Sequence, residues 1–353
     1  MFTKIKSKIL NSCLKILWRV FPQKQLLHSV LRRIQTRMIL NKFIRKLKKS
    51  KSAINIIYDL KTSPPTYGDF YSLVMLGRFL SMSGYELNLI ILESQKPYKY
   101  ITKLSASLRT VLKEYKKIAS LLLPPNTSIQ TSESLSPNNT GIFFDTNILF
   151  FHSPYILELL IKKYKWPIPD NFLLKSKSDV KAPYIAWHVR KSKYDRGRNN
   201  KESSIVRDFA TLSSVFPKHS IMLFGDKVSL KNTFSILSKH KKLGTVSFHA
   251  KQLIKQPAKS FSECIDYLLG CDFYFQRAGG GIGAILFYSS KPYLVVSPLS
   301  TYFTPVPQLR AQNQFFLVDN KNTDVLLFDD LFLKIKSDLQ RKTTHLAKTT
   351  KLV

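Results

Sequence analysis

The chain has 353 residues, 44% of them hydrophobic and 12% aromatic, and its 56 basic against 22 acidic residues give a formal net charge of +34. This composition excludes a disordered chain and allows one large α/β unit or two domains. The charge favours an anionic partner, such as a phosphorylated ligand, a nucleic acid or a membrane surface, although lysines that only solvate the surface would give the same total.

The three cysteines stand at positions 13, 264 and 271 and form no CxxC pair. This pattern predicts a reducing compartment and no disulfide framework. No apolar run approaches the ~20 residues that span a bilayer. Lys15 and Arg19 interrupt the apolar region that a signal peptide would need. We therefore expect a cytoplasmic protein.

Residues 1–52 form a basic segment with apolar residues at helical intervals and no acidic residue. Pro22 divides it into two predicted amphipathic helices, and Trp18 and Phe21 contribute to the apolar face. Such helices lie in anionic lipid interfaces, where each basic side chain contributes about 1 kcal/mol. We expect peripheral membrane binding by residues 1–50; the alternative is an arm packed on the globular body. Nucleic acid is not expected, because no nucleic-acid-binding module is present.

From residue 53 strands and helices alternate, which predicts parallel sheets of βαβ units. The first series, 53–170, predicts an N-terminal Rossmann-like domain. Its expected elements are a strand at 53–60, a loop at 63–70, a helix at 71–84 closed by Gly84, a strand at 86–94, an exposed loop at 124–140 and a strand near 141–151.

The second series, 171–335, predicts a C-terminal Rossmann-like domain, with a basic tail at 336–353. Strands are expected at 184–190, 220–226, 245–250, 272–278 and 293–298, and helices at 203–216, 230–240, 260–271 and 281–290. Two doubly wound domains leave a cleft between the carboxyl ends of their sheets, where such sheets bind ligands. The predicted class is α/β.

The strand "YIAWHVR" ends in two polar groups, His188 and Arg190, which share strand parity and so point the same way. The planar fork of Arg190 suits a diphosphate, and His188 can donate to an oxygen or exchange a proton. Lys191 opens a basic loop that would form a positive rim. In the alternative, Arg190 pairs with a buried acid such as Asp226 and His188 is a core residue. Burying two polar groups at one strand end is costly, which favours the ligand interpretation.

A second candidate is the turn "RAGGG", where a strand ends at Arg277 and Gly279, Gly280 and Gly281 lead into an apolar helix. Backbone N–H groups at a helix start, with no side chains in the way, form an anion site. The glycines do not match a Walker loop. They could also serve only close packing, and this alternative stays open. Their position in the same predicted sheet as Arg190 favours a phosphate role.

Asp69 follows Gly68 at the start of the first domain's helix. An N-cap is the usual role of such a residue. If it faces the cleft, it would instead be a general base or hold an acceptor hydroxyl, and Asp145 competes for that role. No D-x-D motif occurs and the histidines lack metal-ligand spacing, so we expect neither a metal nor a cofactor.

The stretches "HVRKSKYD" and "SFSECIDYLLGCDFYFQRAGGGIGAILFYSSKP" resemble two blocks of the fucosyltransferase-like glycosyltransferases, in which a strand ends in His-x-Arg before a basic loop. A group of bacterial glycosyltransferases with a similar His-x-Arg strand is an equally close comparison. The resemblance covers 184–298. The chain departs from the family pattern at Asp195, a displaced acid, and where glycines replace a serine-rich turn, which leaves the donor open.

The resemblance implies a GT-B fold and a metal-independent, inverting transfer from a nucleotide-sugar. The second domain would then hold the donor and the first the acceptor. Arg190 would bind the β-phosphate and His188 would orient the donor. The glycines 279–281, with Arg277 and Lys191, would surround the phosphates or ribose, and Phe248 and His249 would flank the base.

We therefore predict a glycosyltransferase, peripheral on the inner face of the cytoplasmic membrane, that transfers a sugar from a nucleotide-sugar to a cell-surface glycan or lipid-linked acceptor. Polysaccharide or lipopolysaccharide biosynthesis is the expected setting, with a GDP-linked donor as one option. The alternatives are a nucleotide-sugar epimerase or hydrolase of the same fold, and a non-enzymatic basic protein that binds membranes or nucleic acid.

Overall fold

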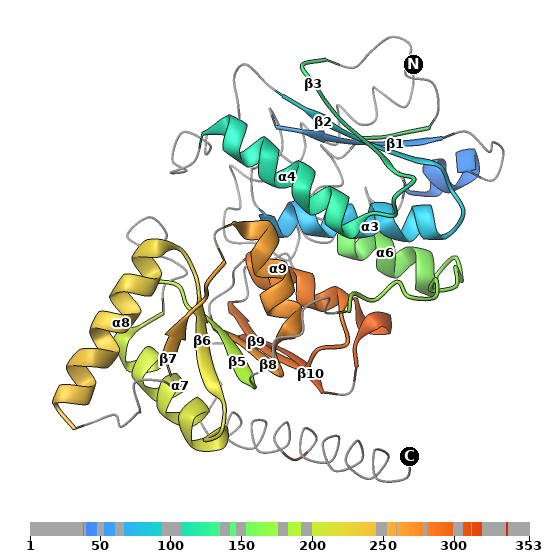
Figure 1. Cartoon of the computed structure of the whole chain (residues 1–353). Helices are drawn as coiled ribbons and strands as arrows, with labels where there is room; N and C mark the ends of the chain where they lie inside the picture. The colour runs from blue at the N-terminus through green and yellow to red at the C-terminus, as the bar shows by residue number, and fades with distance from the viewer. Residues whose placement is uncertain are drawn as a thin grey trace, which may run out of the picture.

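The computed structural model describes residues 38, 40–47, 53–60, 67–93, 107–134, 142–145, 153–175, 183–191, 200–244, 253–258, 260–277, 281–298, 306–311, 313–319 and 337. Within these ranges the strands form two separate parallel sheets, one in each half of the chain. Figure 1 shows the two sheets in different parts of the molecule, with helix α3 between them.

The first sheet has the strand order β3-β2-β1-β4. It consists of β1 (Ile54–Asp59), β2 (Leu87–Leu92), β3 (Ser128–Ser132) and β4 (Ile142–Asp145). Helices α3 (Tyr67–Met82), α4 (Leu108–Leu122) and α6 (Ser153–Lys162) belong to this half of the chain. The near-continuous burial of β1, "INIIYD", is what a parallel strand covered on both faces requires.

The second sheet runs β7-β6-β5-β8-β9-β10, which is the doubly wound order 3-2-1-4-5-6. Its strands are β5 (Tyr184–His188), β6 (Ser220–Phe224), β7 (Leu253–Lys255), β8 (Phe273–Arg277), β9 (Tyr293–Pro298) and β10 (Gln314–Asp319). The helices are α7 (Glu202–Val215), α8 (Lys227–Lys242), α9 (Phe261–Gly270) and two 3₁₀ helices, η4 (Gly281–Tyr288) and η5 (Pro307–Leu309). The predicted fold class, α/β with two doubly wound units, is confirmed.

One hydrophobic core joins the two units, because buried residues of α3, α4, α9 and η4 belong to a single cluster. The closest approach is between backbones at Gly68 and Gly281. A Cβ atom added to Gly68 would lie 2.7 Å from Cα of Gly281, and one added to Gly281 would lie 2.7 Å from the nitrogen of Gly68. Only glycine fits at these two positions. The start of α3 therefore touches the start of η4.

Several elements differ from the sequence-based expectation. Strand β3 lies inside 124–140, which was predicted as an exposed loop. Ile129 is its one apolar residue and none of its residues is buried, so no apolar pattern marks it. Helices α4 and α6 and strand β10 were not predicted. The strand expected at 245–250 lies outside the described residues, and the third strand of the second sheet is β7, at 253–255.

The segment predicted as a helix at 281–290 is a 3₁₀ helix over Gly281–Tyr288. It lies directly against its own sheet: a Cβ on Gly283 would come within 2.1 Å of the hydroxyl of Tyr274 and 2.6 Å of Oε1 of Gln276. Seven of its eight residues are buried, so no polar face exists to give it an amphipathic signature.

The described part of the basic N-terminal arm is a helical turn at 40–47 that packs on the globular body. Its apolar side chains Leu40, Phe43, Ile44 and Leu47 lie in the main core cluster. Asn41 accepts hydrogen bonds from Lys163 and Tyr164. The packed-arm alternative therefore holds for this segment, whereas residues 1–37 lie outside the described residues and their membrane binding stays a prediction. Of the helices in the described ranges, none is long and apolar enough to cross a membrane.

Candidate functional site

The candidate site is the carboxyl edge of the second sheet where β5 and β8 lie side by side. His188 of β5 is in register with Gln276 of β8, so Arg190 and Arg277 follow at the same edge. From β5 the chain order proceeds to β6 and β7 on one side, whereas β8, β9 and β10 lie on the other. The strand order thus reverses between β5 and β8, which is where doubly wound sheets bind ligands.

Asn200 fixes the backbone of this edge. It is 2% exposed. Its Oδ1 accepts from the N–H of Arg190 at 2.8 Å, and its own N–H donates to the carbonyl of Arg190 at 2.7 Å. Its Nδ2 donates to the carbonyl of Arg277 at 3.4 Å, and its carbonyl accepts from Nζ of Lys191 at 3.1 Å. A single side chain therefore joins the ends of β5 and β8. No local sequence signal pointed to it.

His188 is 7% exposed, and its Nδ1 has no hydrogen-bond partner among the described residues. Burial lowers the pKa of His188 to about 3, with the positive charge of Arg190 acting in the same direction and Asp226 opposing them. The imidazole is therefore neutral near pH 7. It can donate or accept a hydrogen bond there, but it does not carry a cation to the site.

Asp226 is an N-cap. Its Oδ1 accepts from the backbone N–H of Val228 and of Ser229 at 3.0 and 2.9 Å, and its Oδ2 accepts from the hydroxyl of Ser229 at 2.7 Å. The same hydroxyl oxygen accepts from the backbone N–H of Lys191 at 2.8 Å. The acid that the sequence offered as a buried partner for Arg190 thus starts α8 and, through Ser229, holds the chain beyond β5.

Arg277 forms an ion pair with a buried acid. Its Nε and one terminal nitrogen donate to the two carboxylate oxygens of Asp208, both at 2.8 Å. Asp208 is 4% exposed, so the pair is buried between β8 and α7. This bidentate contact uses one edge of the planar guanidinium. Arg277 thus anchors the end of β8, and its contact with a donor stays a prediction. Sequence reasoning missed Asp208 because it lies on a helix far from Arg277 in the chain.

The glycine turn is described only from Gly281, which starts η4 beside Gly68. Gly279 and Gly280 lie outside the described residues, as do Phe248 and His249. Asp69 is the third residue of α3, next to Gly68, so its backbone lies at the contact between the two units. Asp145 ends β4 in the first sheet. The structure thus places the start of η4 beside the helix that bears Asp69.

Cys264 and Cys271 are buried free thiols, and burial raises the pKa of each to about 12. Neither is a nucleophile at neutral pH. In the described ranges, no three histidine, cysteine, aspartate or glutamate side chains gather as metal ligands would. The predictions that the chain needs no metal and no cofactor stay predictions.

No protein-family model and no curated protein matches the chain. It is similar to the solved structure of the E. coli ADP-heptose LPS heptosyltransferase II, with 8% identity and a TM-score of 0.49 over 83% of this chain and 99% of that one. A family 9 glycosyl transferase from Veillonella parvula gives 8% and 0.48 over 82% and 97%. POFUT1 in complex with GDP-fucose gives 8% and 0.32 over 68% and 97%. These values describe a distant likeness of overall fold.

Proposed function

We propose that the chain is a glycosyltransferase that moves a sugar from a nucleotide-sugar to a glycan or lipid-linked acceptor. One observation carries the proposal: Arg190 follows β5 at the switch point of a doubly wound sheet, and the strand beside it leads to a glycine-started helix that touches the other unit. The donor diphosphate would lie along this edge, with the acceptor bound from the side of the first unit.

In the proposed reaction an acceptor oxygen attacks the anomeric carbon from the face opposite the diphosphate. The new C–O bond forms as the bond to the β-phosphate oxygen breaks, and the electron pair stays on that phosphate. Arg190 stabilises the negative charge that develops there, with Lys191 nearby, so no metal is required. Asp69 takes the proton of the acceptor hydroxyl. His188, neutral at this edge, orients the donor by hydrogen bonding.

The glycines 279–281 would supply backbone N–H groups to the phosphates or ribose. Phe248 and His249 would flank the base, as the family resemblance implies. The proposal leaves open which nucleotide and which sugar the donor carries. The structures compared above are named for ADP-heptose and GDP-fucose, so ADP and GDP belong in a binding panel beside UDP.

The test is calorimetric titration of ADP, GDP and UDP in the presence of a chelator, with the wild-type protein and with Arg190→Ala. Loss of one charge-assisted contact to the diphosphate is expected to weaken binding by about 30-fold or more. Arg207→Ala, which removes an exposed guanidinium from α7, is the matched control and should bind like the wild type. The proposal is contradicted if Arg190→Ala binds the nucleotide as tightly as the wild type, or if neither the wild type nor the variants bind any of the three nucleotides.

Product analysis then separates transfer from the epimerase or hydrolase alternative. A transferase forms a sugar–acceptor product only when an acceptor glycan is added. An epimerase or hydrolase converts the nucleotide-sugar at the same rate without it.

A further inference from the structure

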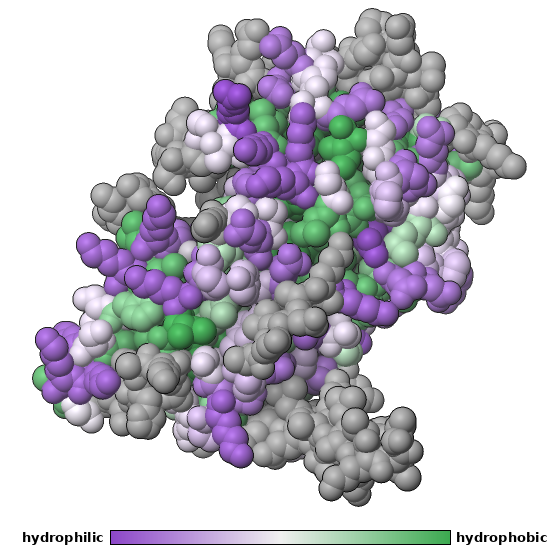
Figure 2. Space-filling view, viewed as in Figure 1, coloured by the Kyte–Doolittle hydropathy of each residue, from purple (hydrophilic) through white to green (hydrophobic). Residues whose placement is uncertain are grey.

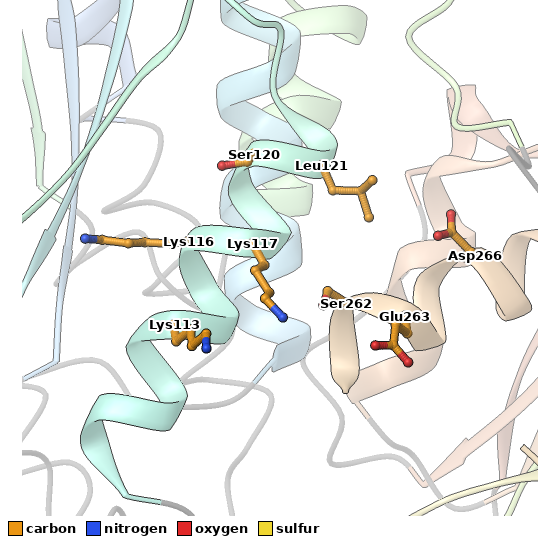
Figure 3. A pocket seen from close by; sticks show the side chains of 8 residues that line it. All are labelled: Lys113, Lys116, Lys117, Ser120, Leu121, Ser262, Glu263 and Asp266. Carbon is orange, nitrogen blue, oxygen red and sulfur yellow. The ribbon is translucent and has the colours of Figure 1, made fainter. Parts of the chain in front are cut away.

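A groove separates two helices from different halves of the chain, α4 of the first unit and α9 of the second (Figure 3). It has a volume of about 570 Å³ and opens to solvent. Helix α4 contributes Lys113, Lys116, Lys117, Ser120 and Leu121, and α9 contributes Ser262, Glu263 and Asp266. In Figure 3 Lys117 and Leu121 extend toward α9, whereas Lys116 extends away from it. Figure 2 shows hydrophilic residues gathered over the outer face of α4.

Direct contacts connect this groove with the proposed reaction site. Phe261, which begins α9, stacks on Tyr67 with ring centroids 3.7 Å apart and planes 20° apart. Tyr67 immediately precedes Gly68, the residue that touches Gly281. The groove is therefore connected to the contact between Gly68 and Gly281 through the stacked rings of Phe261 and Tyr67. Phe261 is 38% exposed, so its ring remains accessible beside the groove.

A second contact holds the two walls together. Oε2 of Glu114 on α4 accepts from the backbone N–H and the hydroxyl of Ser262 at 3.2 and 3.3 Å. Glu114 is 8% exposed, so this contact between the two helices is buried. The groove is thus a fixed feature of the paired units.

The walls carry opposite charges. Lys113 has no ion-pair partner among the described residues, and Lys117 makes only a long, partly exposed contact of 3.8 Å with Glu114. Glu263 and Asp266 line the opposite wall. Ammonium groups bind a phosphate or carboxylate, whereas carboxylates accept hydrogen bonds from hydroxyls. An accessible aromatic ring offers an apolar surface for the C–H face of a sugar.

We propose that the α4–α9 groove binds an anionic carbohydrate, a sugar bearing a phosphate or a carboxylate, as the acceptor of the transfer reaction. The inference rests on the proposed function for its place in the reaction. A nucleic acid or an anionic membrane fits less well, because the carboxylates of Glu263 and Asp266 would repel a continuous polyanion. Lys113 and Lys117 would hold the anionic group, while the carboxylates select for hydroxyls.

The test is binding of glucose 6-phosphate, glucuronic acid and neutral glucose, measured by saturation-transfer NMR and titration. The variant Lys113→Gln/Lys117→Gln removes two charges from the groove and keeps most of each side-chain stem. Lys218→Gln/Lys242→Gln removes the same charge from exposed positions on other elements. Thermal unfolding checks that both variants are folded.

The expected result is that both anionic sugars bind more tightly than glucose and that the groove variant weakens them by about tenfold, while the control stays within about twofold. Comparing the affinities of glucose 6-phosphate and glucuronic acid distinguishes recognition of a phosphate from recognition of a carboxylate. In Glu263→Leu/Asp266→Leu, inorganic phosphate should bind more tightly, because repulsion is lost, whereas glucose 6-phosphate should gain less, because acceptors for its hydroxyls are lost as well.

Equal losses in the groove variant and its control contradict the inference, as does equal binding of glucose and the anionic sugars. A groove variant that loses binding only to RNA or to phosphatidylglycerol vesicles also contradicts it, since the surface would then recognise a polyanion. Arg190→Ala separates this inference from the proposed function: it should lose nucleotide binding and keep the anionic sugar.

Discussion

The two units of this protein share a doubly wound architecture but end their central strands in opposite charges. In the first sheet the neighbouring strands β1 and β4 end in Asp59 and Asp145, and Asp69 is the third residue of α3. In the second sheet β5 leads to Arg190 and Lys191, and the neighbouring β8 ends in Arg277, which is paired with Asp208.

Under the proposed function, this contrast would let one fold, used twice, supply two kinds of chemistry. A cationic edge suits a leaving diphosphate, and an acidic edge suits the removal of a proton from an incoming hydroxyl. The contact of Gly68 with Gly281 brings the starts of α3 and η4 together, so one helix from each unit meets where the two edges would act.

The largest expected effect comes from removing the proposed base of the first unit. Asp69→Asn keeps the size of the side chain and removes the base, so turnover should fall by about 10² to 10⁴-fold. Nucleotide affinity, measured by calorimetry, should stay within about twofold, because the donor is proposed to bind at the other edge. Asp145→Asn is the comparison variant. If Asp145→Asn abolishes turnover while Asp69→Asn remains active, the base is Asp145 at the end of β4 instead of Asp69.

A second prediction concerns His188 on the cationic edge. Its pKa is about 3 in the folded protein, against an ordinary value of 6.5. The unfolded chain therefore binds more protons between these values, and stability falls as the pH drops below about 6.5. Between pH 7 and 4.5 this residue should account for a loss of about 2 to 3 kcal/mol in the free energy of unfolding.

Denaturant unfolding at both pH values, with wild type and His188→Leu, measures that contribution as the difference between their pH dependences. Equal pH dependence of the two proteins would mean that the imidazole is not buried at the edge as described.

The smallest expected effect tests how the cationic edge is positioned. Asn200→Ala removes the side-chain bonds between the ends of β5 and β8, so KM for the donor should rise by about tenfold with little change in kcat. Asn200→Asp keeps the acceptor for the N–H of Arg190 and should restore part of the affinity. A fall in kcat with KM unchanged would contradict a positioning role for Asn200.

Much of the architecture could be predicted from sequence, because parallel strands are apolar runs bounded by turn signals. Strands β5, β6, β8 and β9 lie where those runs predicted them. The features that the pattern missed are those without an apolar signature, such as the polar edge strand β3, or those hidden by uniform burial, such as the 3₁₀ geometry of η4.

The site was partly predictable for a related reason. His188 and Arg190 interrupt a buried strand, and such an interruption is visible locally. The partner of Arg277, the clamp formed by Asn200 and the contact of Gly68 with Gly281 join residues far apart in the chain. A single sequence carries no sign of such pairs, so the ion pair of Arg277 and the role of Asn200 were missed.

The central claim is that a nucleotide diphosphate binds at the carboxyl edge of β5 and β8. Hydrogen exchange with and without saturating nucleotide tests it directly. We expect slower exchange in peptides that contain residues 188–200 and 278–283, and no change in peptides from β10. Protection confined to other elements, or none at saturating nucleotide, would contradict it.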